Sequence, residues 1–179
     1  MSSNNNIIIA IDGHDGSGKT TLAKLLAEKL GGIYIRPFGG DAGLQLIGYA
    51  DKKDYKNVSL FGNQCIRKYA EAYSSDILIF DRHWMTVFSL LPESDRKDAT
   101  WYPLPLTTLC FSDLEHTLAR LQGRTEKGYD KNYHAYYLDL YLKLGLEFNA
   151  NILRTDRHSI EECIDKLMEW YQSSQKYGL

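Results

Sequence analysis

The sequence lacks several features that mark special classes of protein. Its 179 residues include only three cysteines, Cys65, Cys110 and Cys163, which are widely spaced and form no C-x-x-C pair. This pattern argues against a disulfide framework or a zinc site, and it favours a reducing compartment. The five histidines also lack the spacing of metal ligands.

Long hydrophobic runs and an excess of one charge are missing too. The formal net charge is −2, so the chain has no overall basic excess for coating nucleic acid. Residues 1–6 are polar, and the apolar run behind them is too short for a signal peptide or a membrane span. We therefore expect a cytoplasmic protein that binds neither nucleic acid nor membranes and forms one domain over residues 1–179. The sequence is compatible with a homodimer.

The most informative stretch is residues 7–30, where an apolar run, a glycine-rich turn and a helix-spaced segment follow one another. The turn reads GHDGSGKT over residues 13–20 and matches the pattern G-x-x-x-x-G-K-[ST] at every fixed position. This pattern predicts a loop that surrounds nucleotide phosphates with backbone N–H groups, with Lys19 at the β/γ-phosphates and Thr20 on Mg²⁺. The residues expected to contact ATP here are Gly13, Asp15, Gly16, Ser17, Gly18, Lys19, Thr20 and Thr21.

Short apolar runs alternate with helix-spaced segments along the rest of the chain. Strands are expected over residues 7–11, 33–35, 77–80, 106–111 and 151–154. Helices are expected after the glycine-rich turn and over residues 44–49, 58–73, 84–91, 113–121, 133–148 and 159–171. The alternation predicts an α/β three-layer sandwich with a parallel sheet of about five strands and helices on both faces. Ligands then bind at the carboxyl ends of the strands, where Gly13, Arg36 and Asp81 should gather.

Asp81 and Arg82 follow a continuous apolar run, which is typical of a strand covered on both faces. A carboxylate in this position can hold the Mg²⁺ shell or accept a proton, and the arginine can bind a second phosphate through two parallel hydrogen bonds. The alternative is a structural ion pair at the end of a strand.

Arg120 and Arg124 stand four residues apart, where a helix gives way to a polar, glycine-punctuated segment. We expect a mobile lid around residues 120–132, whose arginines neutralise the charge that spreads over the transferred phosphoryl group. The alternative is that both arginines are solvated residues at the C-terminal end of a helix.

With these motifs in place, the chain resembles the thymidylate kinases, which are nucleoside-monophosphate kinases of the phosphate-loop class. The resemblance covers most of the chain. It rests on residues 13–21, on Arg36 followed by Gly39 and Gly40, on Phe61, on Asp81, Arg82 and His83, on the lid arginines, and on Thr155 and Asp156 before residues 159–162.

The resemblance implies roles for single residues. Asp15 would face the sugar and phosphate end of the acceptor, Arg36 and Arg82 would hold the acceptor phosphate, and Phe61 would stack on its base. Asp156 would lie near the adenine of ATP. One branch of the family has an arginine where this chain has Gly16, and the other branch supplies it from the lid, which fits Arg120 and Arg124.

The chain departs from the family at two positions that bear on specificity. Pro37 replaces a glutamate that usually follows the arginine matched by Arg36, and Cys65 replaces an arginine that reads the base. Gln64 offers a substitute on the same helix, although it is equally compatible with a solvated surface. We expect discrimination between thymine and other bases to be weaker than the family norm.

The sequence therefore favours ATP-dependent phosphoryl transfer to a nucleoside monophosphate, a pyrimidine deoxynucleotide, with ATP as donor and Mg²⁺ as cofactor. The rival hypothesis is a deoxynucleoside kinase, which phosphorylates the 5′-hydroxyl of the sugar and usually needs a glutamate base near the Asp81 position. A GTP-driven switch protein would need an N-K-x-D element, which the sequence lacks.

Overall fold

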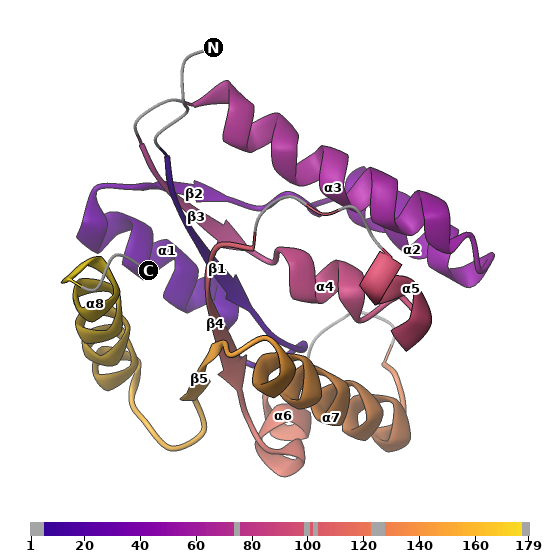
Figure 1. Ribbon diagram of the computed structural model, residues 1–179. Helices are drawn as coiled ribbons and strands as arrows, with labels where there is room; N and C mark the ends of the chain where they lie inside the picture. Colours follow the sequence, from indigo (N-terminus) through magenta and orange to yellow (C-terminus); the bar gives the residue numbers. More distant parts are fainter. Residues whose placement is uncertain (1–5, 74–75, 99–100, 102–103, 123–127, 177–179) are drawn as a thin grey trace.

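The computed structural model describes residues 6–73, 76–98, 101, 104–122 and 128–176, and their strands form one parallel sheet (Figure 1). The strands are β1 (Ile7–Asp12), β2 (Ile33–Ile35), β3 (Ile77–Asp81), β4 (Leu106–Phe111) and β5 (Asn151–Arg154). Their order in space is β2-β3-β1-β4-β5, and Ile9 of β1 pairs with Ile79 on one side and Leu106 on the other. The central strand β1 therefore delivers the glycine-rich turn to the middle of the carboxyl edge of the sheet.

The described residues form eight helices, and helices lie on both faces of this sheet (Figure 1). They are α1 (Lys19–Leu30), α2 (Asp41–Asp51), α3 (Tyr55–Ala72), α4 (Trp84–Phe88), α5 (Glu93–Asp98), α6 (Leu114–Leu121), α7 (Lys131–Glu147) and α8 (Ile160–Lys176). The expected α/β three-layer sandwich with five parallel strands is confirmed. None of the helices in the described ranges has the length and apolar character needed to cross a bilayer.

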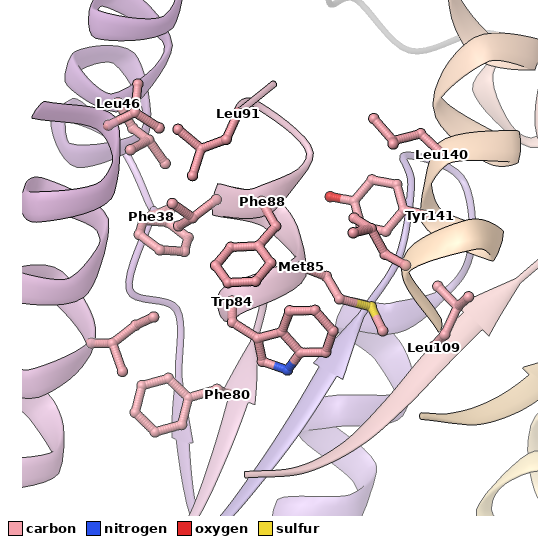
Figure 2. Packing of buried hydrophobic residues seen from close by; sticks show 14 of the residues in the cluster. Phe38, Leu46, Phe80, Trp84, Met85, Phe88, Leu91, Leu109, Leu140 and Tyr141 are labelled. Carbon is pink, nitrogen blue, oxygen red and sulfur yellow. The ribbon is translucent and has the colours of Figure 1, made fainter. Parts of the chain in front are cut away.

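Alternate strand residues point to opposite faces and build two cores. Ile79 packs with Ile9 and Ile11 against α1 and α8, whereas its neighbours Leu78 and Phe80 pack on the other face against α3, α4 and α7. All five residues of α4 are buried, and Figure 2 shows Trp84, Met85 and Phe88 in the middle of the second core. This buried short helix fixes the segment that directly follows Asp81 and Arg82.

The boundaries of several helices differ from expectation. Helix α3 begins at Tyr55 rather than at residue 58, and α4 ends at Phe88 rather than at residue 91. Helix α5 occupies a segment expected to be a loop, because its residues carry no apolar periodicity; it begins directly after Pro92 with Glu93 and Asp95 in its first turn. Helix α2 is longer than the expected 44–49, and α8 continues to Lys176. None of these differences alters the carboxyl edge of the sheet.

Candidate active site

The glycine-rich turn between β1 and α1 has the backbone that its sequence predicts. Gly13, Gly16 and Gly18 have φ values of +148°, +77° and +82°, which a residue with a β-carbon rarely adopts. At Gly13 a β-carbon would also lie 2.4 Å from the carbonyl oxygen of Cys110 on β4. The backbone at Gly13 thus has a positive φ and lies too close to β4 for a β-carbon, so only glycine fits at this position.

Lys19 begins α1 and folds its side chain back over the loop. Its Nζ donates a hydrogen bond to the carbonyl oxygen of His14 at 3.3 Å and lies 3.8 Å from Oδ1 of Asp15. The side chain is 8% exposed. Burial, with a further contribution from the charge of Arg82, lowers the pKa of Lys19 to about 8. The ammonium is thus poised at the loop, with little competing solvent.

Thr20 and Asp81 meet where β3 ends beside the loop. The Thr20 hydroxyl donates a hydrogen bond of 2.7 Å to Oδ2 of Asp81, and the Tyr34 hydroxyl donates one of 2.8 Å to the same oxygen. Burial, and the hydrogen bond to Asp81, raise the pKa of Tyr34 to about 12. Oδ1 of Asp81 is buried and has no hydrogen-bond partner among the described residues. A hydroxyl beside a carboxylate with one unsatisfied oxygen fits a hydrated magnesium ion, which prefers oxygen ligands.

Arg82 lies beside the loop on the cavity side. Its guanidinium donates a 2.5 Å hydrogen bond to Oδ1 of Asp15, and its other terminal nitrogen lies 3.3 Å from the Thr86 hydroxyl and 3.5 Å from the Tyr141 hydroxyl. The sequence alone left open whether Arg82 forms a structural ion pair with a neighbour. Arg82 forms an ion pair with Asp15 of the phosphate loop, rather than one within the Asp81–Arg82 motif, and Asp15 and Arg82 line the same cavity.

A cavity of about 970 Å³ opens above this pair, between α2 on one side and α7 on the other. Figure 2 shows Phe38, Leu46 and Leu91 on one side of the core and Leu140 and Tyr141 on the other, and all five line the cavity. Six tyrosines contribute to its lining: Tyr55 of α3, and Tyr129, Tyr133, Tyr136, Tyr137 and Tyr141. The helical spacing of Tyr133, Tyr136, Tyr137 and Tyr141 predicts core packing with hydroxyl contacts. Tyr141 does belong to the core and its hydroxyl contacts Arg82, but the spacing does not reveal that all four line the cavity.

Arg120 is bound to backbone atoms of the loop and of the β5–α8 turn. Its guanidinium donates hydrogen bonds to the carbonyl oxygen of Gly16 at 3.1 Å and to the carbonyl oxygen of Thr155 at 2.6 Å. The Thr155 hydroxyl in turn donates to the carbonyl oxygen of Ser17 at 2.8 Å. The two side chains therefore brace the loop. Arg124 and part of the expected lid, residues 123–127, lie outside the described residues.

Four further residues assigned from the sequence lie away from the cavity lining. Asp156 forms an ion pair with Arg154, at 2.8 and 2.5 Å, which holds the pKa of Asp156 far below its usual range. Arg36 is exposed after β2, Phe61 packs edge-on against Tyr49 with ring centres 5.8 Å apart, and Gln64 is exposed on α3. Their contacts with a nucleotide stay predictions.

Comparison with curated proteins gives two informative matches, although no family model matches the sequence. A probable thymidylate kinase from Metallosphaera sedula is 31% identical over 166 residues, which cover 82% of this chain and 83% of that protein. A cytidylate kinase from Thermosipho africanus is 58% identical over 52 residues, which cover 28% of this chain and 22% of that protein.

Solved structures share the fold. The thymidylate kinase of Candida albicans has a TM-score of 0.72 at 18% identity, and the match covers 97% of this chain and 94% of that one. A deoxyadenosine kinase from M. mycoides has a TM-score of 0.63 at 17% identity, over 93% of this chain and 100% of that one. The extended match to the Metallosphaera protein shows that this chain belongs to the thymidylate kinase-like family of phosphate-loop nucleotide kinases.

Proposed function

We propose that the chain transfers the γ-phosphoryl group of ATP to the phosphate of a nucleoside monophosphate, a pyrimidine deoxynucleotide. One observation carries this proposal. Lys19 and Arg82 both lie against Oδ1 of Asp15, at 3.8 and 2.5 Å, and Thr20 of the same loop bonds to Asp81. Asp15 and Arg82 in turn line the cavity of about 970 Å³. A donor site and an acceptor site thus share a border made of Asp15 and Arg82.

On the donor side, the N–H groups of the loop and the Lys19 ammonium would bind the β- and γ-phosphates of ATP. Thr20 and Asp81 would hold Mg²⁺, which when bound neutralises charge on the phosphate oxygens. Tyr34 keeps the Asp81 carboxylate oriented through its 2.8 Å hydrogen bond. These residues position the phosphoryl group and balance its charge, which is the main contribution a protein makes to phosphoryl transfer.

On the acceptor side, Arg82 would bind the phosphate of the monophosphate. A monophosphate brings about two negative charges, which need a cation when they leave water. Asp15 orients the guanidinium through the 2.5 Å hydrogen bond and would face the sugar, because like charges keep it from the phosphate. The cavity tyrosines would border the sugar and base.

A deoxynucleoside kinase is the second candidate, and the charge of the cavity favours it. The acidic residues in the lining outnumber the basic ones: Asp15, Asp51, Glu93, Asp139 and Glu147 against Arg82, Arg96 and Lys143. Arg96 is also bonded to the carbonyl oxygens of Phe88 and Leu91, at 3.0 and 3.1 Å. A neutral nucleoside would enter such a cavity without electrostatic opposition.

The two candidates separate in one experiment. Steady-state phosphorylation of thymidine, deoxycytidine and their 5′-monophosphates is measured side by side with ATP and Mg²⁺. We expect the higher kcat/KM for the monophosphates, and Arg82→Ala should raise the acceptor KM or lower kcat. Arg67→Ala is the matched control, because Arg67 lies exposed on α3 in an ion pair with Glu71. A higher kcat/KM for the nucleosides would establish the second candidate, and inactivity toward both groups would contradict each.

The cytoplasmic location, the homodimer and the lid stay predictions from the sequence. Size-exclusion chromatography with light scattering tests the homodimer directly.

A further inference from the structure

Arg82 has an unusual backbone for its position. Its φ value is +78°, a left-handed conformation that a side chain bearing a β-carbon disfavours. Among the described residues, the other non-glycine residues with positive φ are Lys53 and Asn149, and both are exposed next to helix ends. Arg82 instead joins a buried strand to a buried helix. A strained residue persists in such a place only where the surrounding structure determines its conformation.

Asp12, at the end of the neighbouring strand β1, holds Arg82 in this conformation. Its carboxylate is fully buried and accepts hydrogen bonds from the backbone N–H of Gly13 at 3.2 Å and of His83 at 2.8 Å. The N–H of Arg82 itself donates to the carbonyl oxygen of Ile11 at 3.0 Å. Both peptide units that flank the α-carbon of Arg82 are therefore tied to the last two residues of β1.

Asp12 also sets the direction of a hydroxyl that contacts the Arg82 side chain. The Thr86 hydroxyl has one proton, and it lies 2.7 Å from Oδ1 of Asp12, which as a carboxylate can only accept. The oxygen of Thr86 then keeps its lone pairs for Arg82, at 3.3 Å, and for the Tyr141 hydroxyl, at 3.2 Å. A single buried carboxylate thus fixes both the backbone and one side-chain contact of Arg82.

We propose that Asp12 is a positioning residue that acts through Arg82: it holds Arg82 in its left-handed conformation so that the guanidinium faces Asp15 and the acceptor. This inference rests on the acceptor-binding role proposed above for Arg82. Asp12 lies behind the loop and does not line the cavity, so it does not contact the acceptor itself.

Replacement of Asp12 by asparagine separates this role from simple packing. The asparagine side chain has nearly the same size and shape, but one of its two terminal atoms is an amide nitrogen, which donates, so it cannot accept the N–H groups of both His83 and Gly13 in the geometry that the carboxylate has. We expect Asp12→Asn to lower kcat/KM for the acceptor by ~10-fold or more. The dissociation constant of a non-hydrolysable ATP analogue should change by less than ~3-fold, because the Asp12 side chain contacts the loop only through the 3.2 Å hydrogen bond from Gly13 among the described residues.

A double-mutant cycle tests whether Asp12 acts through Arg82. Asp12→Asn, Arg82→Ala and the double variant are compared by kcat/KM for the acceptor, with circular dichroism and melting temperature measured for each. If Asp12 acts through Arg82, the loss caused by Asp12→Asn should shrink to less than ~2-fold once Arg82 is already alanine. An equal loss in both backgrounds would overturn the inference and leave the role of Arg82 intact. A normal kcat/KM in Arg82→Ala would overturn both the inference and the proposed acceptor site.

Thr86 supplies a second route if Asp12→Asn does not fold. Thr86→Val removes the hydroxyl but keeps the shape, and its loss of kcat/KM should likewise disappear in the Arg82→Ala background. Thr86→Ser should restore the wild-type value, because serine retains the hydroxyl. Asp54→Asn is the matched control for the loss of a negative charge in Asp12→Asn, since Asp54 caps α3 through Asn57 and lies outside the cavity lining. A Thr86→Val variant with unchanged kinetics would contradict the inference.

Discussion

Nε2 of His14, in the phosphate loop, lies 2.8 Å from Nδ1 of His134, in the first turns of α7. Both side chains are buried, and the His14 ring stacks parallel to Tyr137 at 5.7 Å, with an angle of 5° between the planes. A hydrogen bond between two imidazoles needs one neutral acceptor nitrogen. Burial lowers the pKa of His14 to about 4, so His14 is neutral at physiological pH in this contact between the loop and the cavity wall.

This contact predicts that acid destabilises the protein. Unfolded His14 binds a proton below its ordinary pKa of 6.5, whereas folded His14 does so only below about 4. The unfolded state therefore binds more protons between these values, and the free energy of unfolding should fall as pH drops from 6.5 to 4, by on the order of 3 kcal/mol for this group. Urea unfolding at pH 7, 6, 5 and 4 measures the loss.

His14→Gln should flatten that pH dependence, because glutamine does not titrate and can still hydrogen-bond to His134. His83, which burial also drives to a low pKa of about 3, should account for part of the remaining slope. His158→Gln is the control, since His158 lies on the turn before α8 and outside the cavity lining. An unchanged slope in His14→Gln would show that His14 titrates normally.

The sequence predicts the donor half of this site better than the acceptor half, and the reason is the range of the contacts. Lys19 reaches the carbonyl oxygen of His14, five residues earlier, so one contiguous motif carries the geometry of the loop. The alternation of apolar runs and helices predicts a parallel sheet, and the observed order, with β3 next to β1, places Asp81 beside Thr20. The fold class and the family followed from these local patterns and are confirmed.

The cavity depends on contacts that no local pattern specifies. His14 meets a residue 120 positions later, and Arg82 meets Tyr141, 59 positions later. Tyrosines at helical spacing fit packing and cavity lining equally well, because spacing defines a face and does not reveal what covers it. For the same reason the sequence could place Phe61 on α3 but could not show that it packs against Tyr49. Its role toward a base stays a prediction.

Lys19→Ala should abolish phosphoryl transfer, lowering kcat/KM by ~10³-fold or more, and leave the fold intact. Lys19 belongs to neither hydrophobic core, so its loss removes charge from the site without opening the core. In the wild type, kcat/KM for ATP should fall as pH rises above about 8, where Lys19 loses its proton and no longer attracts the phosphates. Initial rates measured at low ATP over a series of pH values give this fall in kcat/KM. Rates for Lys19→Ala within a few-fold of wild type would contradict the loop assignment.

Gly62 and Gly48 form a matched pair of helical glycines with opposite expected effects on stability. A β-carbon at Gly62 of α3 would lie 2.6 Å from a methyl of Val87 on α4, while one at Gly48 of α2 meets nothing within 4 Å. Gly62→Ala should therefore lower the free energy of unfolding by about 1–3 kcal/mol. Gly48→Ala should raise it by about 0.5–1 kcal/mol, because alanine restricts the unfolded chain and favours the helix. Urea unfolding measures the free energy of unfolding of both variants. Changes of the same sign would contradict the packing of α3 on α4.

The two arginines near the expected lid should separate by the kind of defect that each replacement causes. The Arg120 guanidinium donates hydrogen bonds to the carbonyl oxygens of Gly16 and Thr155. Arg120→Ala should therefore lower the melting temperature and raise the KM for ATP, because the loop loses these hydrogen bonds. Gly16 leaves the loop without an arginine and Arg120 is bonded to the backbone, so we predict that Arg124 balances the charge of the transition state. Arg124→Ala should lower kcat by ~10³-fold or more with a smaller change in KM and no change in melting temperature.

Lysine replacements sharpen this comparison. Arg124→Lys keeps the positive charge and should recover part of kcat, whereas Arg120→Lys cannot reach both carbonyl oxygens with one ammonium and should remain less stable than wild type. Steady-state kinetics with thermal unfolding of the four variants gives all the values needed. A normal kcat in Arg124→Ala, together with a ~10³-fold loss in Arg120→Ala at unchanged melting temperature, would reverse the assignment. It would mean that Arg120 leaves the Gly16 and Thr155 carbonyls during the reaction and turns toward the transferred phosphoryl group.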